Sequence, residues 1–268
     1  MVMSNISRVT DVHKLQRLYW PFLALDGACE EVVGSVAGSF VWGNQNYPLL
    51  RFVFRGPATT MPPIRLGLFA LLHGDEPAGA LGLQHFLAAL VGDPAPARGY
   101  ELTFYPLCNP TGYEDGTRSN RAGVDLNREF WRDSAQPEIK ILEEELRTQH
   151  FDGIVALHAD DTSDGLYGYT QGRVLNEALL GPALRASAHV LPVNQGALID
   201  GFPAEAGLIG DCFEGILAPP SEQRPRPFEI IFETPATVPM TQQARAIDCA
   251  LRSVLNEYRE FIAQGANL

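Results

Sequence analysis

Apolar runs of strand length alternate along this chain with segments whose apolar residues recur at helical spacing. The strand-length runs cover residues 64–72, 101–107, 152–157 and 228–232. Helical spacing covers residues 77–91, 137–149, 173–188 and 240–263, with a break near Gly181 and Pro182. Strands that alternate with helices are typical of an α/β fold, in which a twisted, mostly parallel mixed sheet carries helices on both faces.

The N-terminal part of the chain departs from this alternation. Apolar positions over residues 8–24 predict a helix that ends before Pro21 or shortly after it, because proline disrupts a helix interior. Residues 31–56 read as a β-hairpin with its turn at residues 43–46. We therefore expect a helix and a hairpin to precede the alternating strands and helices.

Two further segments carry their own expectations. In the helix over 137–149, Glu143 to Glu145 are expected to face water, opposite an apolar stripe. Residues 190–227 are rich in proline and glycine and predict no regular element. No repeat and no linker divides the chain, so we expect one catalytic domain over residues 1–268.

Composition narrows the class of protein. The chain has 268 residues, 46% of them hydrophobic and 19% charged, which is enough for a substantial core. Its net charge of -12 argues against nucleic acid and anionic membranes as partners. The four cysteines form no Cys-x-x-Cys pair, so neither a thiolate zinc site nor a disulfide framework is indicated. Without a signal peptide or a membrane-spanning run, we expect a soluble, cytoplasmic protein.

Each of the four strand-length runs delivers a polar residue at its carboxyl end. These residues are His73, Asn109, His158 and Glu233. Ligands of open α/β sheets bind in the crevice outside the carboxyl ends of the strands. If the four strands are neighbours, their ends open into one crevice. This coincidence is stronger evidence for a functional site than any single residue.

Three of the polar residues near these strand ends fit a catalytic zinc ion. His73 and Glu76 flank the junction between a predicted strand and a predicted helix, and His158 ends another strand. Two histidines and a glutamate hold zinc while leaving a position for water. The alternatives are structural, since Glu76 could complement the dipole of the following helix. His158 could be a hydrogen-bonded core histidine.

Glu233 is the candidate general base beside such a metal. A metal-activated water still benefits from a group that accepts its proton. Glu233 follows an apolar strand, where partial burial would raise its pKa toward a useful range. Its alternative role is that of a surface carboxylate at a strand end.

The segment 118–128 forms a candidate anion site within an acidic protein. It contains three arginines, Arg118, Arg121 and Arg128, together with Asn120 and Asn127. Arginine binds a carboxylate through two hydrogen bonds and can also hold the oxyanion of a tetrahedral intermediate. The alternative, a charged surface loop, would not require the apolar Val124 and Leu126 that interrupt the polar residues.

Taken together, the motifs at these positions resemble the zinc metallocarboxypeptidase family, whose superfamily includes the succinylglutamate desuccinylase and aspartoacylase enzymes. The resemblance spans about residues 45–265 and rests on six motifs: His73-Gly-Asp-Glu76-Pro-Ala-Gly, Asn109-Pro110-x-Gly112-Tyr113, Arg118-x-Asn120, Gly123-Val-Asp-Leu-Asn127-Arg128, Leu-His158 and Phe-Glu233-Thr. It implies a carboxypeptidase-like fold with one Zn²⁺ per chain, held by His73, Glu76 and His158. It also implies that Glu233 activates the zinc water and then protonates the leaving amine.

The same resemblance implies roles for the arginine-rich segment. Arg118 looks like the residue that stabilises the oxyanion, and Arg121 competes for that role. Asn127 and Arg128 are similar to the pair that grips the free carboxylate of the substrate. For the tyrosine that often closes over this carboxylate, Tyr167 and Tyr169 are the nearest candidates.

The expected function is zinc-dependent hydrolysis of a C-terminal amide bond next to a free carboxylate, in a small peptide. The alternative is an N-acyl amino acid deacylase on the same scaffold, and a third possibility is a binding module without catalysis. Glu129 and the residues after His158 differ from the usual peptidase pattern, which leaves the substrate open but not the metal. The single helix expected after Glu233 favours a compact carboxypeptidase-like enzyme. Oligomeric state is not predicted.

Overall fold

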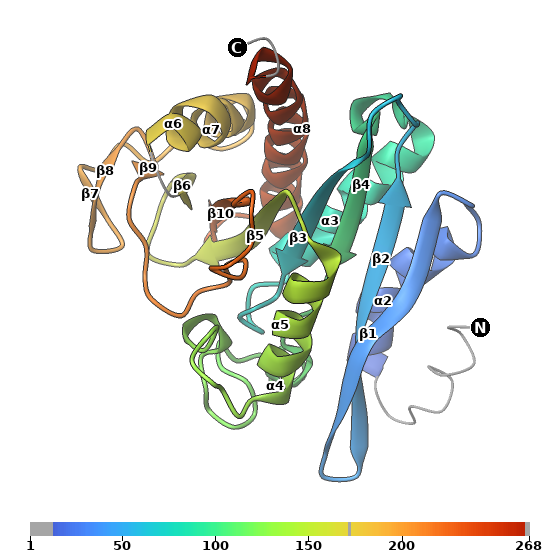
Figure 1. Cartoon of the computed structure of the whole chain (residues 1–268). Helices are drawn as coiled ribbons and strands as arrows, with labels where there is room; N and C mark the ends of the chain where they lie inside the picture. Colours follow the sequence, from blue (N-terminus) through green and yellow to red (C-terminus); the bar gives the residue numbers. More distant parts are fainter. Residues whose placement is uncertain (1–12, 171–172, 266–268) are drawn as a thin grey trace.

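The computed structural model describes residues 13–170 and 173–265 and has one large mixed sheet (Figure 1). Its ten strands follow the order β1-β2-β4-β3-β5-β10-β6-β9-β8-β7. Their bounds are β1 Val32–Trp42, β2 Gln45–Arg55, β3 Ile64–Ala70, β4 Tyr100–Tyr105, β5 Gly153–Asp160, β6 Tyr167–Thr170, β7 Leu198–Ile199, β8 Phe202–Glu205, β9 Leu208–Ile209 and β10 Phe228–Pro235. All four strand-length apolar runs are strands of this sheet.

The centre of the sheet is parallel and its flanks are antiparallel. Strands β4, β3, β5 and β10 pair in parallel, so their carboxyl ends share one edge. The predicted hairpin forms β1 and β2, which extend the sheet on the β4 side. On the β10 side, β6 pairs antiparallel and β9 pairs parallel to β6. The predicted α/β class with a mixed sheet is confirmed, and the parallel pairing lies mainly in the central strands.

Helices cover both faces of the sheet, as predicted (Figure 1). On one face lie α2 His13–Asp26, α3 Ala78–Gly92 and α8 Met240–Gly265, and on the other lies α5 Pro137–Gln149. The remaining helical segments are η1 Ala95–Ala97, α4 Pro110–Asp115, η2 Leu126–Arg128, α6 Arg173–Leu175, η3 Asn176–Leu180 and α7 Gly181–Ser187. Within the described ranges, no helix is long and apolar enough to cross a bilayer. The cytoplasmic location stays a prediction.

Neighbouring residues of β4 show how the two faces are packed. Phe104 packs against Phe86 of α3, with ring centroids 6.2 Å apart. Tyr105 points to the opposite face, where it stacks on Phe69 at 4.5 Å and donates a hydrogen bond to Glu145 of α5. This alternation buries both faces of the central strands, which explains their nearly continuous apolar sequences.

The N-terminal helix, predicted over residues 8–24 with an end before Pro21 or shortly after it, passes through Pro21 and ends at Asp26. Its side chains Leu15, Tyr19 and Phe22 are buried, and Phe22 stacks on the sheet at 5.2 Å from Phe52. The packing of this apolar face outweighs the hydrogen bond that proline removes. Residues 8–12 of the predicted helix lie outside the described residues.

The prediction that Glu143 to Glu145 face water is wrong for two of the three side chains. Glu144 is exposed, but Glu143 and Glu145 are buried. Glu145 accepts hydrogen bonds of 2.6 Å from both Arg51 and Tyr105, which lie on strands of the sheet. Helical periodicity alone does not reveal such partners, because they come from remote segments.

The segment 190–227, for which no element was predicted, contains the short strands β7, β8 and β9. These strands extend the sheet beyond β6 (Figure 1). Strands of two to four residues are too short to leave a readable period in the sequence.

Candidate active site and metal centre

The carboxyl ends of β3, β5 and β10 open into a cavity of about 510 Å³. Of the residues predicted to form the site, those that line it are His73, Glu76, Arg118, Asn127, Arg128, His158, Tyr167, Tyr169 and Glu233. They come from distant parts of the sequence. The fold therefore brings nearly the whole predicted set into one space.

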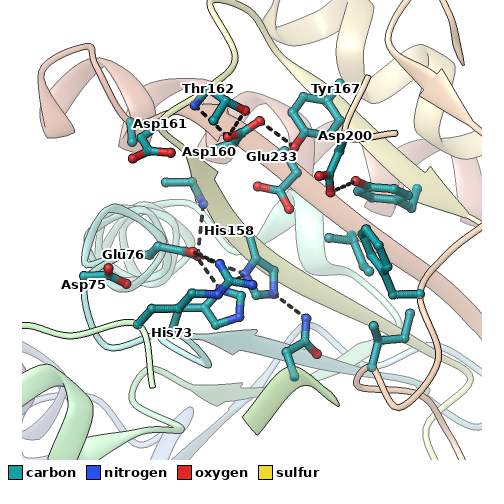
Figure 2. Close-up of a pocket in the computed structure, with 18 of the residues that line it drawn as sticks. His73, Asp75, Glu76, His158, Asp160, Asp161, Thr162, Tyr167, Asp200 and Glu233 are labelled. Atoms are coloured by element: carbon teal, nitrogen blue, oxygen red, sulfur yellow. Dashed lines mark hydrogen bonds and ion pairs between the residues drawn. The ribbon is translucent and has the colours of Figure 1, made fainter. Parts of the chain in front are cut away.

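His73, Glu76 and His158 converge at one end of the cavity (Figure 2). Nδ1 of His73 lies 2.7 Å from Oε1 of Glu76 and 3.1 Å from Nδ1 of His158. Nδ1 of His158 lies 2.9 Å from Oε2 of Glu76. One ligand atom from each side chain lies within 4.8 Å of the others, and all three residues are buried. The sequence-predicted metal ligands thus form one compact group.

The turn between β3 and α3 places His73 and Glu76. Leu71 leaves the strand with a φ of 54°, which turns the chain sharply away from the sheet. Gly74 then passes so close to the next loop that a Cβ on it would lie 2.0 Å from the carbonyl carbon of Gly112. A larger residue at position 74 would displace the turn and with it both candidate ligands.

Asn109, in the loop after β4, supports this turn through hydrogen bonds. Its Oδ1 accepts the backbone N–H of Gly112 at 2.9 Å and so caps α4. Its Nδ2 donates to the carbonyl oxygens of Leu72 and Arg118, at 3.2 Å and 3.3 Å. Asn109 is fully buried and does not line the cavity. Its role in the site is therefore structural.

The geometry of the three ligands fits a tetrahedral metal ion. Zn–N bonds of about 2.0–2.1 Å separate two nitrogens of a tetrahedral site by roughly 3.3 Å, close to the 3.1 Å between the two Nδ1 atoms. Burial raises the pKa of Glu76, but His158 and His73 outweigh it and lower that pKa to about 2. The backbone N–H of Ala159 also donates to Oε2 of Glu76 at 3.1 Å. A buried carboxylate beside two imidazole nitrogens is a suitable site for a cation.

Asp125 orients one of these ligands, although the sequence analysis assigned it no role. Its Oδ1 lies 3.1 Å from Nε2 of His73, and its Oδ2 accepts hydrogen bonds of 3.2 Å and 3.0 Å from Arg118. A proton on Nε2 donated to Asp125 leaves the lone pair of Nδ1 directed at the other two ligands. The available signal was the position of Asp125 inside the motif Gly-Val-Asp-Leu-Asn-Arg.

The two histidines have pKa values shifted in opposite directions. Burial lowers the pKa of His73, but its hydrogen bonds to Asp125 and Glu76 outweigh this effect and raise the pKa. For His158 burial prevails over the attraction of Glu76, so the pKa is lowered. A neutral imidazole at position 158 is the form that binds a metal.

Arg118 lies between the metal cluster and the open cavity. Its Nη1 is 3.7 Å from Oε1 of Glu76, and its side chain is 48% exposed. Because Asp125 holds the other side of the guanidinium, Nη1 is directed toward the space beside the cluster. Arg118 is placed to donate to an oxygen bound next to a metal.

Glu233 faces the cavity from β10, next to His158 on β5. The two residues are register partners on parallel strands, so their side chains emerge on the same face of the sheet. Burial raises the pKa of Glu233 well above the usual value of a carboxyl group, and the charges of Glu76 and Asp160 raise it further. A carboxylate with a raised pKa is suited to accept a proton near neutral pH.

Asn127 and Arg128 reach the cavity from η2. Nδ2 of Asn127 lies 3.4 Å from Nε2 of His158, and its Oδ1 accepts the backbone N–H of Leu217 at 2.9 Å. The guanidinium of Arg128 lies 4.2 Å from the ring centroid of Phe213. In the described part of the chain, no carboxylate forms an ion pair with Arg128. Its charge is therefore open to an anion in the cavity.

The structure places Arg121 outside the cavity. Its Nη1 donates to the hydroxyl of Tyr47 at 2.6 Å, and its Nη2 donates to Glu114 at 2.7 Å. Its Nε donates to Asp115 at 2.8 Å. Because these partners occupy its donors on the far side of the loop, Arg121 does not line the cavity, and its role as a competitor of Arg118 or as a substrate-binding residue stays a prediction. Arg118 is the arginine that faces the cluster.

The two tyrosines of β6 are held by acidic residues that the sequence analysis did not single out. The hydroxyl of Tyr167 donates to Asp160 at 2.8 Å, and that of Tyr169 donates to Asp200 at 2.6 Å. Both tyrosines line the cavity, but the hydroxyl of Tyr169 is already bonded to a protein carboxylate, so its role over the substrate carboxylate stays a prediction. Asp200 comes from the segment 190–227, which carried no sequence signal.

Neither a family model nor a curated protein matches the sequence. Solved structures do match. A candidate metallopeptidase from Shewanella amazonensis is 26% identical, with a TM-score of 0.74, over 90% of this chain and 92% of that one. A metallo-carboxypeptidase from Pseudomonas aeruginosa, in complex with (2-guanidinoethylmercapto)succinic acid, is 17% identical, with a TM-score of 0.66, over 93% of this chain and 69% of that one. A succinylglutamate desuccinylase from a Silicibacter species is 18% identical, with a TM-score of 0.57, over 84% of this chain and 66% of that one.

These similarities confirm that the chain has a fold similar to that of a metallopeptidase, a metallo-carboxypeptidase and a succinylglutamate desuccinylase, as the resemblance in sequence implied. The Pseudomonas and Silicibacter proteins share too little sequence with this chain to show more than the fold. The Shewanella protein matches nearly the full length of both chains. Together with the His/Glu/His cluster, the similarities indicate a hydrolase of the metallopeptidase type.

Proposed function

We propose that the protein is a zinc-dependent hydrolase that cleaves a C-terminal amide bond next to a free carboxylate, in a small peptide. The observation that carries the proposal is the position of Glu233 and Arg128 in the same cavity as the cluster of His73, Glu76 and His158. A metal site, a base and a carboxylate-binding cation are the parts that this reaction requires.

Each residue has a specific task in the proposed reaction. His73, Glu76 and His158 hold one zinc ion, which when bound supplies a Lewis acid and lowers the pKa of a water molecule. Glu233 accepts the proton of the attacking water and returns it to the nitrogen of the leaving amine. Arg118 donates a hydrogen bond to the carbonyl oxygen as negative charge develops on it.

Arg128 and Asn127 bind the free carboxylate of the substrate. A guanidinium stacked on an aromatic ring keeps its edge available for the two hydrogen bonds that a carboxylate accepts. The similar metallo-carboxypeptidase from Pseudomonas is in complex with a succinic acid derivative, a ligand that carries carboxyl groups. This complex supports a carboxylate-bearing substrate for the present cavity.

An N-acyl amino acid deacylase would use the same metal ligands, the same base and the same arginine. The fold is also similar to that of a desuccinylase, so residue identity alone does not separate the two reactions. The two reactions differ in the group on the acyl side of the cleaved bond. A deacylase pocket should reject a tetrapeptide, whereas a peptidase pocket should accept it.

The experiment is mass spectrometry of the products formed by zinc-loaded protein from one pool of free-carboxylate peptides and N-acyl amino acids. Peptides shortened by one residue support the proposal. Deacylated amino acids beside intact peptides would replace it with the deacylase. The variant Glu233→Gln is the control for contaminating hydrolases, because it should bind zinc and release neither class of product. Wild-type protein that leaves both classes intact would contradict the proposal.

A further inference from the structure

The cavity carries more negative charge than the proposed reaction uses. Its carboxyl groups belong to Asp75, Glu76, Asp160, Asp161, Asp200 and Glu233, whereas its only arginines among the described residues are Arg118 and Arg128. Two of the acids have roles as ligand and base. The substrate carboxylate adds a further negative charge, so the remaining acids favour a cationic group elsewhere on the substrate.

Among these acids, Asp200 has the geometry of a binding group. Its Oδ2 accepts the hydroxyl of Tyr169 at 2.6 Å, which fixes the carboxylate in place. Within residues 13–170 and 173–265, no donor pairs with its Oδ1. Asp160 differs, because its Oδ1 accepts both the N–H and the hydroxyl of Thr162 and its Oδ2 accepts Tyr167. Asp200 is exposed and lines the cavity, so its Oδ1 remains available as an acceptor.

The local backbone explains the residue type at position 200 only in part. Asp200 and Gly201 form the two-residue turn between β7 and β8, with φ values of 48° and 82°. Hairpin turns with two positive φ values favour asparagine or aspartate followed by glycine. The turn thus accounts for a short polar side chain at this position but not for its charge.

Asp200 and the carboxylate-binding arginine line the same cavity and are connected by a series of aromatic contacts. The guanidinium of Arg128 stacks on Phe213 at 4.2 Å, and Phe213 contacts Phe202 with ring centroids 4.8 Å apart. Phe202 contacts Tyr169 at 6.0 Å, and Tyr169 donates to Asp200. This row of rings runs from the arginine to the carboxylate. Arg128, Phe213, Tyr169 and Asp200 all line the cavity.

Figure 2 shows Asp200 on the opposite side of Glu233 from Asp75 and Asp161. Asp75 lies beside Glu76 in the same view. Of the surplus acids, Asp200 is the one that the aromatic contacts connect with Phe213, on which Arg128 stacks.

We infer that Asp200 selects substrates whose released amino acid carries a cationic side chain, such as lysine. The inference rests on the proposed function and adds the substrate class. The α-carboxylate binds Arg128, the aliphatic part of the side chain packs against Phe213 and Tyr169, which line the cavity, and its ammonium group donates to Oδ1 of Asp200. The charge of Asp200 is the specificity determinant.

The test compares two N-acylated dipeptides that end in lysine or norleucine, which differ in the terminal ammonium group. For the zinc-loaded wild type, we expect a kcat/KM ratio of lysine to norleucine of about tenfold or more, as for a charge-assisted hydrogen bond. In Asp200→Asn the ratio should fall toward one. Asparagine retains the turn preference and an oxygen that accepts the hydroxyl of Tyr169, so the variant removes only the charge.

Asp164→Asn is the matched control, because Asp164 is exposed and does not line the cavity. It should leave the ratio unchanged. A wild-type ratio near one, or a ratio that Asp200→Asn leaves intact, overturns the inference while the proposed function stands. Added salt should reduce the lysine preference of the wild type, because ions screen a pair at a partly open site.

A binding measurement separates the inference from the proposed function if neither dipeptide is cleaved. Isothermal titration of the zinc-loaded protein with free L-lysine and L-norleucine needs no turnover. Tighter binding of lysine that is lost in Asp200→Asn supports the charge recognition even though the hydrolase assignment has failed. Equal affinity for the two amino acids overturns the inference by itself.

Discussion

Glu233 and His158 are register partners on the parallel strands β10 and β5, at the edge of the sheet where both strands end. Their pairing puts a carboxylate with a raised pKa and a buried imidazole with a lowered pKa side by side above one cavity. A rigid sheet holds this arrangement more precisely than a loop would. Glu233 and His158 have different proposed roles, so substitutions can test the two residues separately.

Replacing Glu233 by Gln should retain zinc and lower kcat by about 10²–10⁴, the usual contribution of a general base. Glutamine has the same shape but accepts no proton at neutral pH. The measurement is steady-state kinetics on the best peptide, with metal content determined on the same samples. A variant with full zinc and near-normal kcat would remove Glu233 from the role of base.

Replacing His158 by Ala should abolish stoichiometric zinc binding at micromolar metal. The change removes one of three predicted ligands, so the loss should exceed the tenfold to about 100-fold typical of supporting residues. Equilibrium dialysis against zinc provides the measurement. His85→Ala is the control, because His85 is exposed on α3 and lies away from the cavity. Equal zinc content in the two variants would contradict the ligand assignment.

Asp125→Asn tests the orientation of His73. We expect zinc affinity to fall by about tenfold to 100-fold, because the charge that orients the imidazole is lost. Asparagine still caps η2, where Asp125 now accepts the N–H of Asn127 at 2.9 Å, so the fold should be retained. Asp115→Asn is the matched control, since Asp115 pairs with Arg121 outside the cavity. Competition with a zinc chelator measures both variants, and equal affinities would leave Asp125 without this role.

Asp160→Asn should move the acid limb of the kcat/KM profile toward lower pH. Burial raises the pKa of Glu233, and the charges of Glu76 and Asp160 raise it further. Glu233 must be ionised to accept a proton, so activity is lost as the pH falls through its pKa. Removing the charge of Asp160 lowers that pKa and keeps the base ionised at lower pH. Profiles of the wild type and the variant on one peptide provide the comparison, and coincident acid limbs would exclude this coupling.

Arg128→Ala should reduce discrimination between a peptide with a free carboxylate and the same peptide amidated at its C-terminus. The wild type should prefer the free acid by about tenfold to 100-fold, and the variant should lose most of this preference through a higher KM. Arg132→Ala is a suitable control, because Arg132 pairs with Glu214 at the surface and does not line the cavity. Undiminished discrimination in Arg128→Ala would refute the carboxylate contact.

The sequence alone predicted the class of the fold and most of the candidate site. The apolar runs that become β3, β4, β5 and β10 are readable because strands buried on both faces need nearly continuous apolar residues. The helix over 137–149 was predicted with the bounds that it has in the structure. His73, Glu76 and His158 were identifiable because ligand chemistry restricts the residue types and because strand ends mark where ligands bind.

Only the tertiary structure distinguished between residues that look alike in sequence. Arg118 and Arg121 are three positions apart, yet one faces the cluster and the other is held by Glu114 and Asp115. Glu145 looks like an exposed helix residue until Arg51 and Tyr105 are seen to pack against it. In each case the deciding partner comes from a segment remote in sequence, or from the far side of a folded loop.

Asp200, which lines the cavity, is the clearest example of a residue whose position only the tertiary structure reveals. Asp200 belongs to a stretch with no readable period, and its sequence context indicates only a turn. Local patterns report which backbone conformation a segment prefers, because that preference depends on neighbouring residues. The direction in which a charge points, and what it can bind, depends on long-range packing that brings Tyr169 and Asp200 together. The sequence by itself therefore determined the chemistry available to this protein, and the tertiary structure decided how that chemistry is arranged around a substrate.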